Sequence, residues 1–386
     1  MKLFYISQGN IPTKWAHSMQ AMKMAEAFAK LVPNFRLITQ APWFSFLQPR
    51  FDYETWYGIR HPFRIVRLPT LRSAYWQSRN SVWDMRFDAA AARYTAAKRP
   101  DLILTRSPNA GRLCVQEGIS TIIERHAPPE EHQFPHIQSI KDAESFLGIV
   151  TTTDDHKTAY IEAGIPEEKI FVESNAVDIN AFSGFPDKNS LRESLDLSNN
   201  RFLATYSGHL YQDRGVEDIL QCAVRLKEVQ FLHVGGWEED VARRELEAQH
   251  LNNVLFTGFV PNSRIPKYLA ASDVLLMPYS RGCKVVPWMC PLKLFEYMAS
   301  RRPIIATDLP AIRKHLQDGR NARLIPPDSP GALTEAIAWI RDNPNEASRM
   351  AGAAFEDVRS CTWTNRAKAI LARFAPDGIS DVSKGS

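Results

Sequence analysis

The chain has 386 residues, of which 44% are hydrophobic and 23% are charged, and its formal net charge is +4. This composition is ordinary for a globular protein, and the length exceeds what one hydrophobic core usually holds, so two domains of about 150–200 residues are expected. No apolar run approaches the roughly 20 residues that span a bilayer, and the first residues, MKLFYISQGN, have the pattern of a strand rather than of a signal peptide, which predicts a cytoplasmic location.

Short apolar runs alternate with helical patterns or loops along the first half of the chain. The six runs are Lys2–Ser7, Arg36–Gln40, Arg64–Leu68, Leu102–Arg106, Thr121–His126 and Ile149–Thr153. This alternation is typical of a parallel sheet with helices on both faces, so an α/β domain is predicted.

A loop with Gly and Pro follows the first predicted strand and leads into a helix from about His17. The apolar face expected for this helix consists of Met19, Met22, Ala25, Ala29 and Leu31. The loop lacks the GxGxxG pattern, which argues against a dinucleotide-dependent dehydrogenase.

Positive charge is concentrated in residues 1–100, which hold fifteen Lys and Arg against five Asp and Glu. Such an excess suggests an anionic partner, either a phosphorylated acceptor or a membrane surface, rather than nucleic acid. A solvated Arg-rich surface is the alternative.

Aromatic rings are interleaved with these arginines in residues 41–87. The rings are Trp43, Phe44, Phe46, Phe51, Tyr53, Trp56, Tyr57, Phe63, Tyr75, Trp76, Trp83 and Phe87. Amphipathic rings beside Arg suit lipid headgroups or a bulky acceptor, so peripheral contact with the inner membrane face is one interpretation. Packing of most rings in a hydrophobic core is the other.

Polar residues end the fourth and fifth predicted strands, where the sequence reads Thr105-Arg106-Ser107 and Ile123-Glu124-Arg125-His126. A strand-end His is by itself usually a structural hydrogen-bonding residue. His132 and His136 have a poor spacing for a metal, and the five cysteines show no CxxC pair, so no metal site is predicted.

The second half repeats the α/β pattern from a strand at Phe202–Gly208. Arg214 and Gly215 follow that strand, Gln230–Gly236 ends in a Gly-Gly turn, and another strand is expected at Val254–Val260. A Gly-Gly turn is a usual place for a ligand to approach the backbone.

Ser272–Asp308 forms a strand, loop, helix and strand. The strands are Val274–Tyr279 and Pro303–Thr307, and Pro291 suits the first turn of the helix between them. The predicted apolar stripe is Leu292, Phe295, Met298 and Ala299, which leaves Lys293, Glu296 and Tyr297 outside it. A loop that leaves a parallel strand and reaches a helix start is where an open α/β sheet binds phosphate.

The helix sequence PLKLFEYMAS, followed by RPIIATD, resembles the nucleotide-sugar site of retaining glycosyltransferases of the GT-B fold, in glycosyltransferase family four. The resemblance implies two Rossmann-like domains. They are predicted at residues 1–178, joined by a crossover helix at about 362–377, and at residues 179–361, which bind the nucleotide.

The resemblance also implies roles for residues along the chain. Glu296 matches the Glu that accepts hydrogen bonds from the donor ribose, and a carboxylate can serve two adjacent hydroxyls. Arg214 and Lys293 would neutralise the diphosphate, and His126 would contact the donor sugar; these three are the expected catalytic residues. Further donor contacts are expected at Gly9, Gly208, His209, Gly235, Phe259, Val260, Pro291 and Leu292, and acceptor-side contacts at Lys14, His17 and Arg106.

Two departures from the family pattern bear on donor recognition. His209 stands where the family has Arg, and Trp288 stands where the family has a Glu that recognises the donor sugar. A partly charged His could make diphosphate binding weaker or pH-dependent.

The predicted function is therefore retaining, metal-independent transfer of a sugar from a nucleoside diphosphate, expected to be UDP or GDP, to an unidentified acceptor. No cofactor is predicted. A GT-B sugar-nucleotide epimerase, a catalytically silent nucleotide-sugar-binding protein and a peripheral membrane scaffold are the alternatives.

Overall fold

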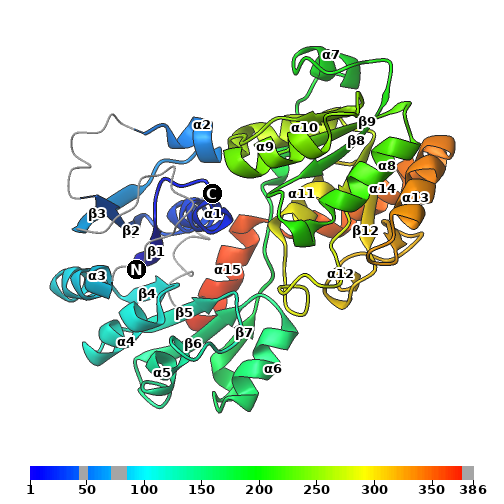
Figure 1. Ribbon diagram of the computed structural model, residues 1–386. Helices are drawn as coiled ribbons and strands as arrows, with labels where there is room; N and C mark the ends of the chain where they lie inside the picture. Colours follow the sequence, from blue (N-terminus) through cyan, green and yellow to red (C-terminus); the bar gives the residue numbers. More distant parts are fainter. Residues whose placement is uncertain (43–50, 71–84, 376–386) are drawn as a thin grey trace. The chain divides into compact units, whose positions relative to one another are not determined.

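Two parallel β-sheets organise the chain in the computed structural model, which describes residues 1–42, 51–70 and 85–375 (Figure 1). The chain divides into two compact units, one of Met1–Asn175 with helix α15 (Trp363–Phe374) and one of Ala176–Thr362. Some predictions fall outside the described residues. They concern the rings of Trp43, Phe44, Phe46, Tyr75, Trp76 and Trp83.

The sheet of the first unit has the strand order β3-β2-β1-β4-β5-β6-β7, and all neighbouring strands are parallel. Its strands are β1 (Lys2–Asn10), β2 (Asn34–Pro42), β3 (Arg64–Thr70), β4 (Leu102–Thr105), β5 (Thr121–Arg125), β6 (Phe146–Thr151) and β7 (Ile170–Val172). Its remaining helices are α1 (Ala16–Leu31), α2 (Tyr53–Tyr57), α3 (Met85–Lys98), α4 (Pro108–Gln116), α5 (Phe134–Gln138), α6 (Asp154–Glu162) and the 3-10 helix η2 (Glu167–Lys169). The order reverses between β1 and β4, and such a switch point is where α/β sheets bind ligands.

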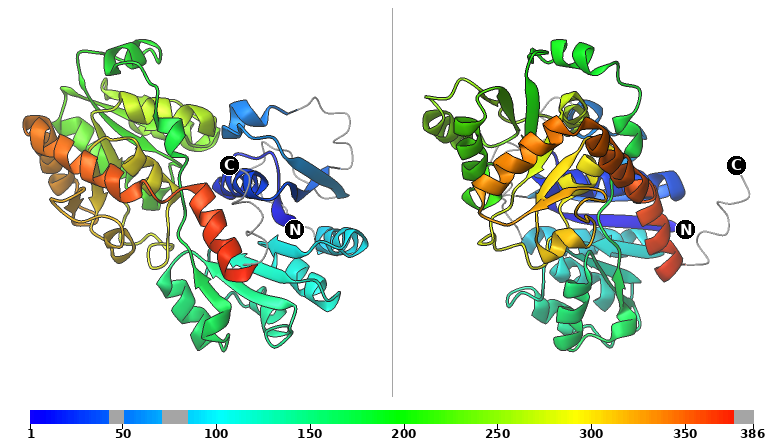
Figure 2. Two further views of the ribbon diagram at one scale, coloured as in Figure 1. Left: turned by 180° about the vertical axis from the view of Figure 1, so that it is seen from behind. Right: turned by 90° about the vertical axis from the view of Figure 1, so that its right-hand side faces the viewer.

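Side chains of strand β1 alternate between the two faces of this sheet. Phe4 and Ile6 pack with Phe87 of α3 and Ala110 of α4. Tyr5 points to the opposite face, where its hydroxyl reaches Glu124. Helix α15 lies beside α1 (Figures 1 and 2), so the last helix of the chain is part of the first unit.

The sheet of the second unit has the order β10-β9-β8-β11-β12-β13, again with parallel neighbours and with a switch point between β8 and β11. Its strands are β8 (Phe202–Ser207), β9 (Val229–Val234), β10 (Val254–Phe256), β11 (Val274–Met277), β12 (Ile304–Thr307) and β13 (Arg323–Ile325). Its helices are η3 (Ile179–Phe182), α7 (Lys188–Glu193), η4 (Gln212–Arg214), α8 (Val216–Arg225), α9 (Glu238–Glu247), η5 (Asn262–Arg264), α10 (Ile265–Ala271), α11 (Leu292–Ala299), α12 (Pro310–Arg313), α13 (Pro330–Asp342) and α14 (Pro344–Val358).

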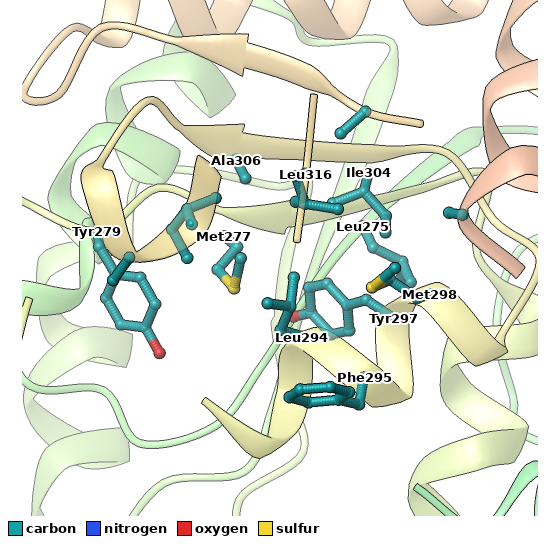
Figure 3. Packing of buried hydrophobic residues seen from close by; sticks show 14 of the residues in the cluster. Leu275, Met277, Tyr279, Leu294, Phe295, Tyr297, Met298, Ile304, Ala306 and Leu316 are labelled. Carbon is teal, nitrogen blue, oxygen red and sulfur yellow. The ribbon is translucent and has the colours of Figure 1, made fainter. Parts of the chain in front are cut away.

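Helix α11 packs on this sheet with a wider apolar face than the sequence predicts. Figure 3 shows Leu294 and Tyr297 of the helix beside Leu275 of β11. The prediction that Tyr297 lies outside the apolar stripe is wrong, because its side chain is fully buried. Its hydroxyl finds partners on two strands, which an amphipathic pattern cannot reveal.

The aromatic and basic region is partly described. Tyr57 and Phe87 are buried, and Phe51 forms a half-buried cluster with Tyr53 and Trp56, at ring-centre distances of 5.1 and 5.3 Å. Core packing therefore accounts for at least two of the rings. No helix in the described residues is both long and apolar enough to cross a membrane.

Candidate functional site

Loops after β8, β9 and β11 meet at the carboxyl edge of the second sheet. The amide of Gly208 donates to the carbonyl of Val234 over 2.8 Å. Gly235 has φ +110°, and a Cβ there would lie 2.8 Å from the carbonyl oxygen of Gly208. The positive φ and the close approach both require glycine at this position. Because glycine has no side chain, the backbone is left uncovered there.

Tyr297 ties helix α11 to this edge. Its buried hydroxyl accepts a hydrogen bond from the Ser207 amide (2.8 Å) and donates one to the Leu276 carbonyl (3.2 Å). These partners end β8 and belong to β11, so the strands on both sides of the switch point hold α11 through Tyr297. Lys293 and Glu296 lie on the same helix and are positioned by it.

The ammonium group of Lys293 lies over two tyrosine rings. Its Nζ is 4.0 Å from the ring centre of Tyr206 and 5.4 Å from that of Tyr279. Burial and the positive charge of Arg214 lower the pKa of Lys293 to about 7, although Glu296 acts in the opposite direction. Cation–π contacts hold the ammonium in place without neutralising its charge.

Arg214 is the second cation of this group. It ends η4, its guanidinium lies 5.0 Å from the ring centre of Tyr279, and its Nη1 donates to Cys283 Sγ over 3.3 Å. Asp213 lies 3.4 Å away in an ion pair. Arg214 and Lys293 thus contact one ring and repel each other, and a bound diphosphate would relieve that repulsion.

The structure also describes the other residues of the second unit that are predicted to contact the donor. Glu296 is half-buried and accepts from Asn262 Nδ2 over 3.2 Å. The ring of His209 stacks on Tyr211 and Trp237, at ring-centre distances of 5.1 and 5.6 Å. Phe259, Pro291 and Leu292 are half-buried, whereas Val260 is buried in a hydrophobic cluster.

The first unit gathers its predicted residues around the switch point of its own sheet. A Cβ on Gly9 would lie 2.4 Å from Nε2 of His17, so that ring packs directly on the glycine backbone. Burial and the charge of Arg106 lower the pKa of His17 to about 4, which keeps the ring neutral at pH 7. Lys14 is half-buried in the loop before α1.

His126 belongs to a buried network centred on Glu124. Its Nε2 lies 3.0 Å from Oε1 of Glu124, and Gln20 Nε2 donates to the same oxygen over 3.0 Å. Gln20 in turn accepts from Arg106 Nη1 over 2.9 Å. Arg366 of α15 completes the network with an ion pair of 2.8 Å to Glu124. The structure therefore brings His126 and Arg106 together through residues that carry no predicted role.

Sequence reasoning missed several residues that contact the predicted site residues of the two units. They are Gln20, Glu124 and Arg366 in the first unit and Tyr206, Asn262 and Tyr279 in the second. A charged residue that closes an otherwise apolar strand, as Glu124 closes Thr121–Ile123, is the signal that could have identified the first group. No cluster of three or more His, Cys, Asp or Glu suited to a metal occurs within the residues that the structure describes, and metal independence stays a prediction.

Comparison with known proteins shows a likeness to sugar-transferring enzymes. Residues 201–343, all in the second unit, match the family described as glycosyl transferases group 1. The chain is 28% identical over 170 residues to the alpha-D-kanosaminyltransferase of Streptomyces kanamyceticus and 25% identical over 192 residues to the alpha-galactosylglucosyldiacylglycerol synthase of Streptococcus pneumoniae. These matches cover 42% and 48% of this chain, and 42% and 49% of the relatives. The chain thus spans less than half the length of these curated relatives.

The structural comparison covers both units, whereas the family match covers residues of the second unit alone. HepE of Anabaena, solved in complex with UDP, superposes with a TM-score of 0.73 over 97% of this chain and 100% of that one, at 17% sequence identity. The two sheets therefore form the GT-B fold, and the predicted fold class is confirmed. The family match thus covers residues 201–343 of the second unit, and over both units the likeness is one of fold.

Proposed function

We propose that the chain is a retaining glycosyltransferase that uses a nucleoside diphosphate sugar and acts without a metal ion. The observation that carries this proposal is the pair of Lys293 and Arg214 beside Tyr279, at the switch point of a parallel sheet. Cations fixed by aromatic rings can neutralise a departing diphosphate, which is the charge that a metal supplies in other enzymes. HepE of Anabaena, solved with UDP and also with UDP-glucose, supports UDP as the first nucleotide to test.

In the proposed reaction, the bond between the anomeric carbon and the diphosphate oxygen breaks while an acceptor hydroxyl oxygen bonds to the same carbon. The hydroxyl proton leaves with the diphosphate, so atoms and charges balance. Arg214 and Lys293 stabilise the negative charge that develops on the leaving group, and Glu296 holds the ribose by accepting hydrogen bonds. We propose that His126 contacts a hydroxyl of the sugar and that Arg106 contacts the acceptor.

The acceptor class is open between a lipid and a soluble glycan. The alpha-galactosylglucosyldiacylglycerol synthase is named for a lipid product, whereas the alpha-D-kanosaminyltransferase is named for the sugar that it transfers and not for its acceptor. The basic and aromatic residues before α3 favour a lipid or another amphipathic acceptor at a membrane surface. Sedimentation with anionic vesicles tests this part of the proposal.

The reaction itself can be tested before the acceptor is known, because water can serve as a slow acceptor. The purified chain is incubated with UDP-glucose, GDP-mannose and related donors in EDTA, and NMR follows the anomer of the sugar first released. Release of the same anomer as in the donor supports retention. Release of the opposite anomer would overturn it.

A catalytically silent nucleotide-sugar-binding protein is the second candidate, favoured by the stacking of His209 on Tyr211 and Trp237 where the family pattern has an arginine. Binding of a donor without release of nucleoside diphosphate, in water and with acceptor extracts, would support this candidate instead.

A further inference from the structure

Glu124 and Arg366 form a buried ion pair in the first unit. The two side chains are no more than 1% exposed, and Arg366 Nη2 lies 2.8 Å from Glu124 Oε1. Glu124 ends β5, whereas Arg366 comes from α15, the last helix of the chain. Burying two charges is costly, and an ion pair of this kind is weak evidence of stabilisation by itself. The pair therefore calls for a role other than stability.

The partners of Glu124 determine its protonation state. Tyr5 Oη donates to Oε2 over 3.2 Å, and Gln20 Nε2 donates to Oε1 over 3.0 Å. Arg366 has only N–H groups and can only donate. Burial by itself raises the pKa of the Glu124 carboxyl, but Arg366 and the hydrogen bond with His126 outweigh it and hold that pKa well below its usual range. Glu124 is therefore an ionised carboxylate that accepts every hydrogen bond it makes.

An ionised Glu124 fixes the proton of His126. Because the carboxylate has no hydrogen to give, the 3.0 Å contact requires Nε2 of His126 to carry the proton. Burial and the charge of Arg106 lower the pKa of His126 to about 4, so at pH 7 the ring is neutral and carries one N–H. Its other nitrogen, Nδ1, then has a lone pair and can only accept a hydrogen bond.

We infer that Glu124 and Arg366 are positioning residues that hold His126 as the neutral Nε2–H tautomer, with Nδ1 presented as an acceptor to a hydroxyl of the bound sugar or acceptor. This inference rests on the proposed function for its ligand, but its structural part does not. The chemistry is selective: Nδ1 can accept from an O–H group and cannot donate to a phosphate oxygen. His126 in this form is therefore suited to a hydroxyl group and not to a phosphate.

Arg366 connects this tautomer to the last helix. Its Nε donates to the carbonyl of Ser174 over 2.9 Å, and its Nη1 lies 3.3 Å from Sδ of Met24 on α1. These two contacts hold the guanidinium in addition to its ion pair with Glu124. Helix α15 therefore helps to determine which nitrogen of His126 carries the proton, although it lies far from β5 in the sequence.

The tautomer can be measured without any activity. NMR of the full chain with 15N-labelled histidine separates the Nε2–H, Nδ1–H and doubly protonated forms by their nitrogen shifts and proton–nitrogen couplings, and His126→Gln assigns the signal. We expect a single Nε2–H form from pH 8 to pH 5. A doubly protonated ring at pH 7, or the Nδ1–H form, overturns the inference whatever the enzyme does.

Substitution of Arg366 tests the positioning role. In Arg366→Met the buried Glu124 loses its counter-charge and should take up a proton, so the neutral form of His126 becomes a mixture of tautomers and kcat falls by about 3–10-fold, the value of one hydrogen bond. Arg366→Lys should restore the Nε2–H signal. Arg373→Met, an exposed arginine on the same helix, should leave both signal and kcat unchanged.

The two parts of the inference fail separately. A wild-type Nε2–H signal that persists unchanged in Arg366→Met shows that Arg366 does not position the ring, which overturns that residue's role. A tautomer change without any change in kcat, in an enzyme that turns over, overturns the contact between Nδ1 and substrate. Absence of turnover in the wild-type chain contradicts the proposed function and leaves the NMR result to decide the tautomer.

Discussion

The ammonium nitrogen of Lys293 lies 4.0 Å from the centre of the Tyr206 ring. This contact joins the first turn of α11 to the end of β8, and Tyr297 fixes the same two elements through the Ser207 amide. Burial and the positive charge of Arg214 lower the pKa of Lys293 to about 7, close to physiological pH. Lys293 therefore has a fixed position, and its protonation state can change when a ligand binds.

Replacement of Lys293 by methionine should weaken the binding of a nucleoside diphosphate by about 10–100-fold, because one charge-assisted contact of about 1.5–3 kcal/mol is lost. Calorimetry with UDP measures the dissociation constant. Lys267→Met is the matched control, since Lys267 is exposed on α10 and should leave the affinity unchanged. Equal affinities in the two variants would remove Lys293 from the site.

Binding of the diphosphate should take up a proton. With a pKa of about 7, Lys293 is mostly neutral at pH 8 in the free protein, and a nearby phosphate charge should raise its pKa and restore the ammonium. The affinity should consequently fall as pH rises from 7 to 9. Calorimetry at pH 8 in buffers of different ionisation enthalpy counts the protons. Lys293→Arg, which stays charged, should abolish the uptake, and an uptake that survives in this variant would assign the proton elsewhere.

Glu296→Ala should raise the dissociation constant for UDP by about 10–100-fold, corresponding to one or two lost charge-assisted hydrogen bonds to the ribose. The wild-type chain should also discriminate between UDP and 2′-deoxy-UDP, and the variant should not. Glu335→Ala, on the exposed side of α13, serves as the control. A variant that still prefers the ribonucleotide would place ribose recognition on another group.

His233 should make the protein less stable in acid. Its ring is fully buried in β9, lies 4.7 Å from the Phe256 ring centre, and has no hydrogen-bond partner at either nitrogen within the described part of the chain. Burial and the charge of Arg244 lower its pKa to about 3. Between pH 6.5 and pH 3 the unfolded chain binds the proton and the folded chain does not, so stability falls as pH falls through this window.

The variant His233→Leu isolates this effect. It removes an unsatisfied polar ring and should raise the free energy of unfolding at pH 7 by about 1–3 kcal/mol. At pH 5 the difference from wild type should grow by about 2 kcal/mol, since the protonation penalty is absent in the variant. Urea denaturation at both pH values measures it. A difference that does not depend on pH would show that His233 titrates normally in the folded chain.

Much of the fold is predictable from local patterns. The strands β4, β11 and β12 are buried along their whole length, and short runs of at least three apolar residues reveal such strands directly. Pro291 indicates the start of α11 because its missing N–H costs nothing there. The strand order is a different matter, since it depends on crossovers that no local pattern records.

The site is less predictable because its geometry depends on distant partners. Tyr297 is polar at its tip, and only Ser207 and Leu276, on strands far away in the sequence, explain its burial. The pair of Glu124 and Arg366 joins β5 to the last helix and leaves no local signal. Residues chosen by family resemblance, such as Arg214 and Lys293, were found because their motifs are contiguous, whereas the rings that hold them were not.

The most direct test of the central claim is a thermal-shift measurement on the full chain with UDP, GDP, ADP, TDP and CMP and their sugar conjugates, in EDTA. Ligand at about 100 times its dissociation constant should add about 2.7 kcal/mol of apparent stability. We predict a rise in Tm with one nucleoside diphosphate and its sugar conjugates, reduced in Lys293→Met and Glu296→Ala. Unchanged Tm values with every nucleotide would contradict a nucleotide-sugar site in the second unit.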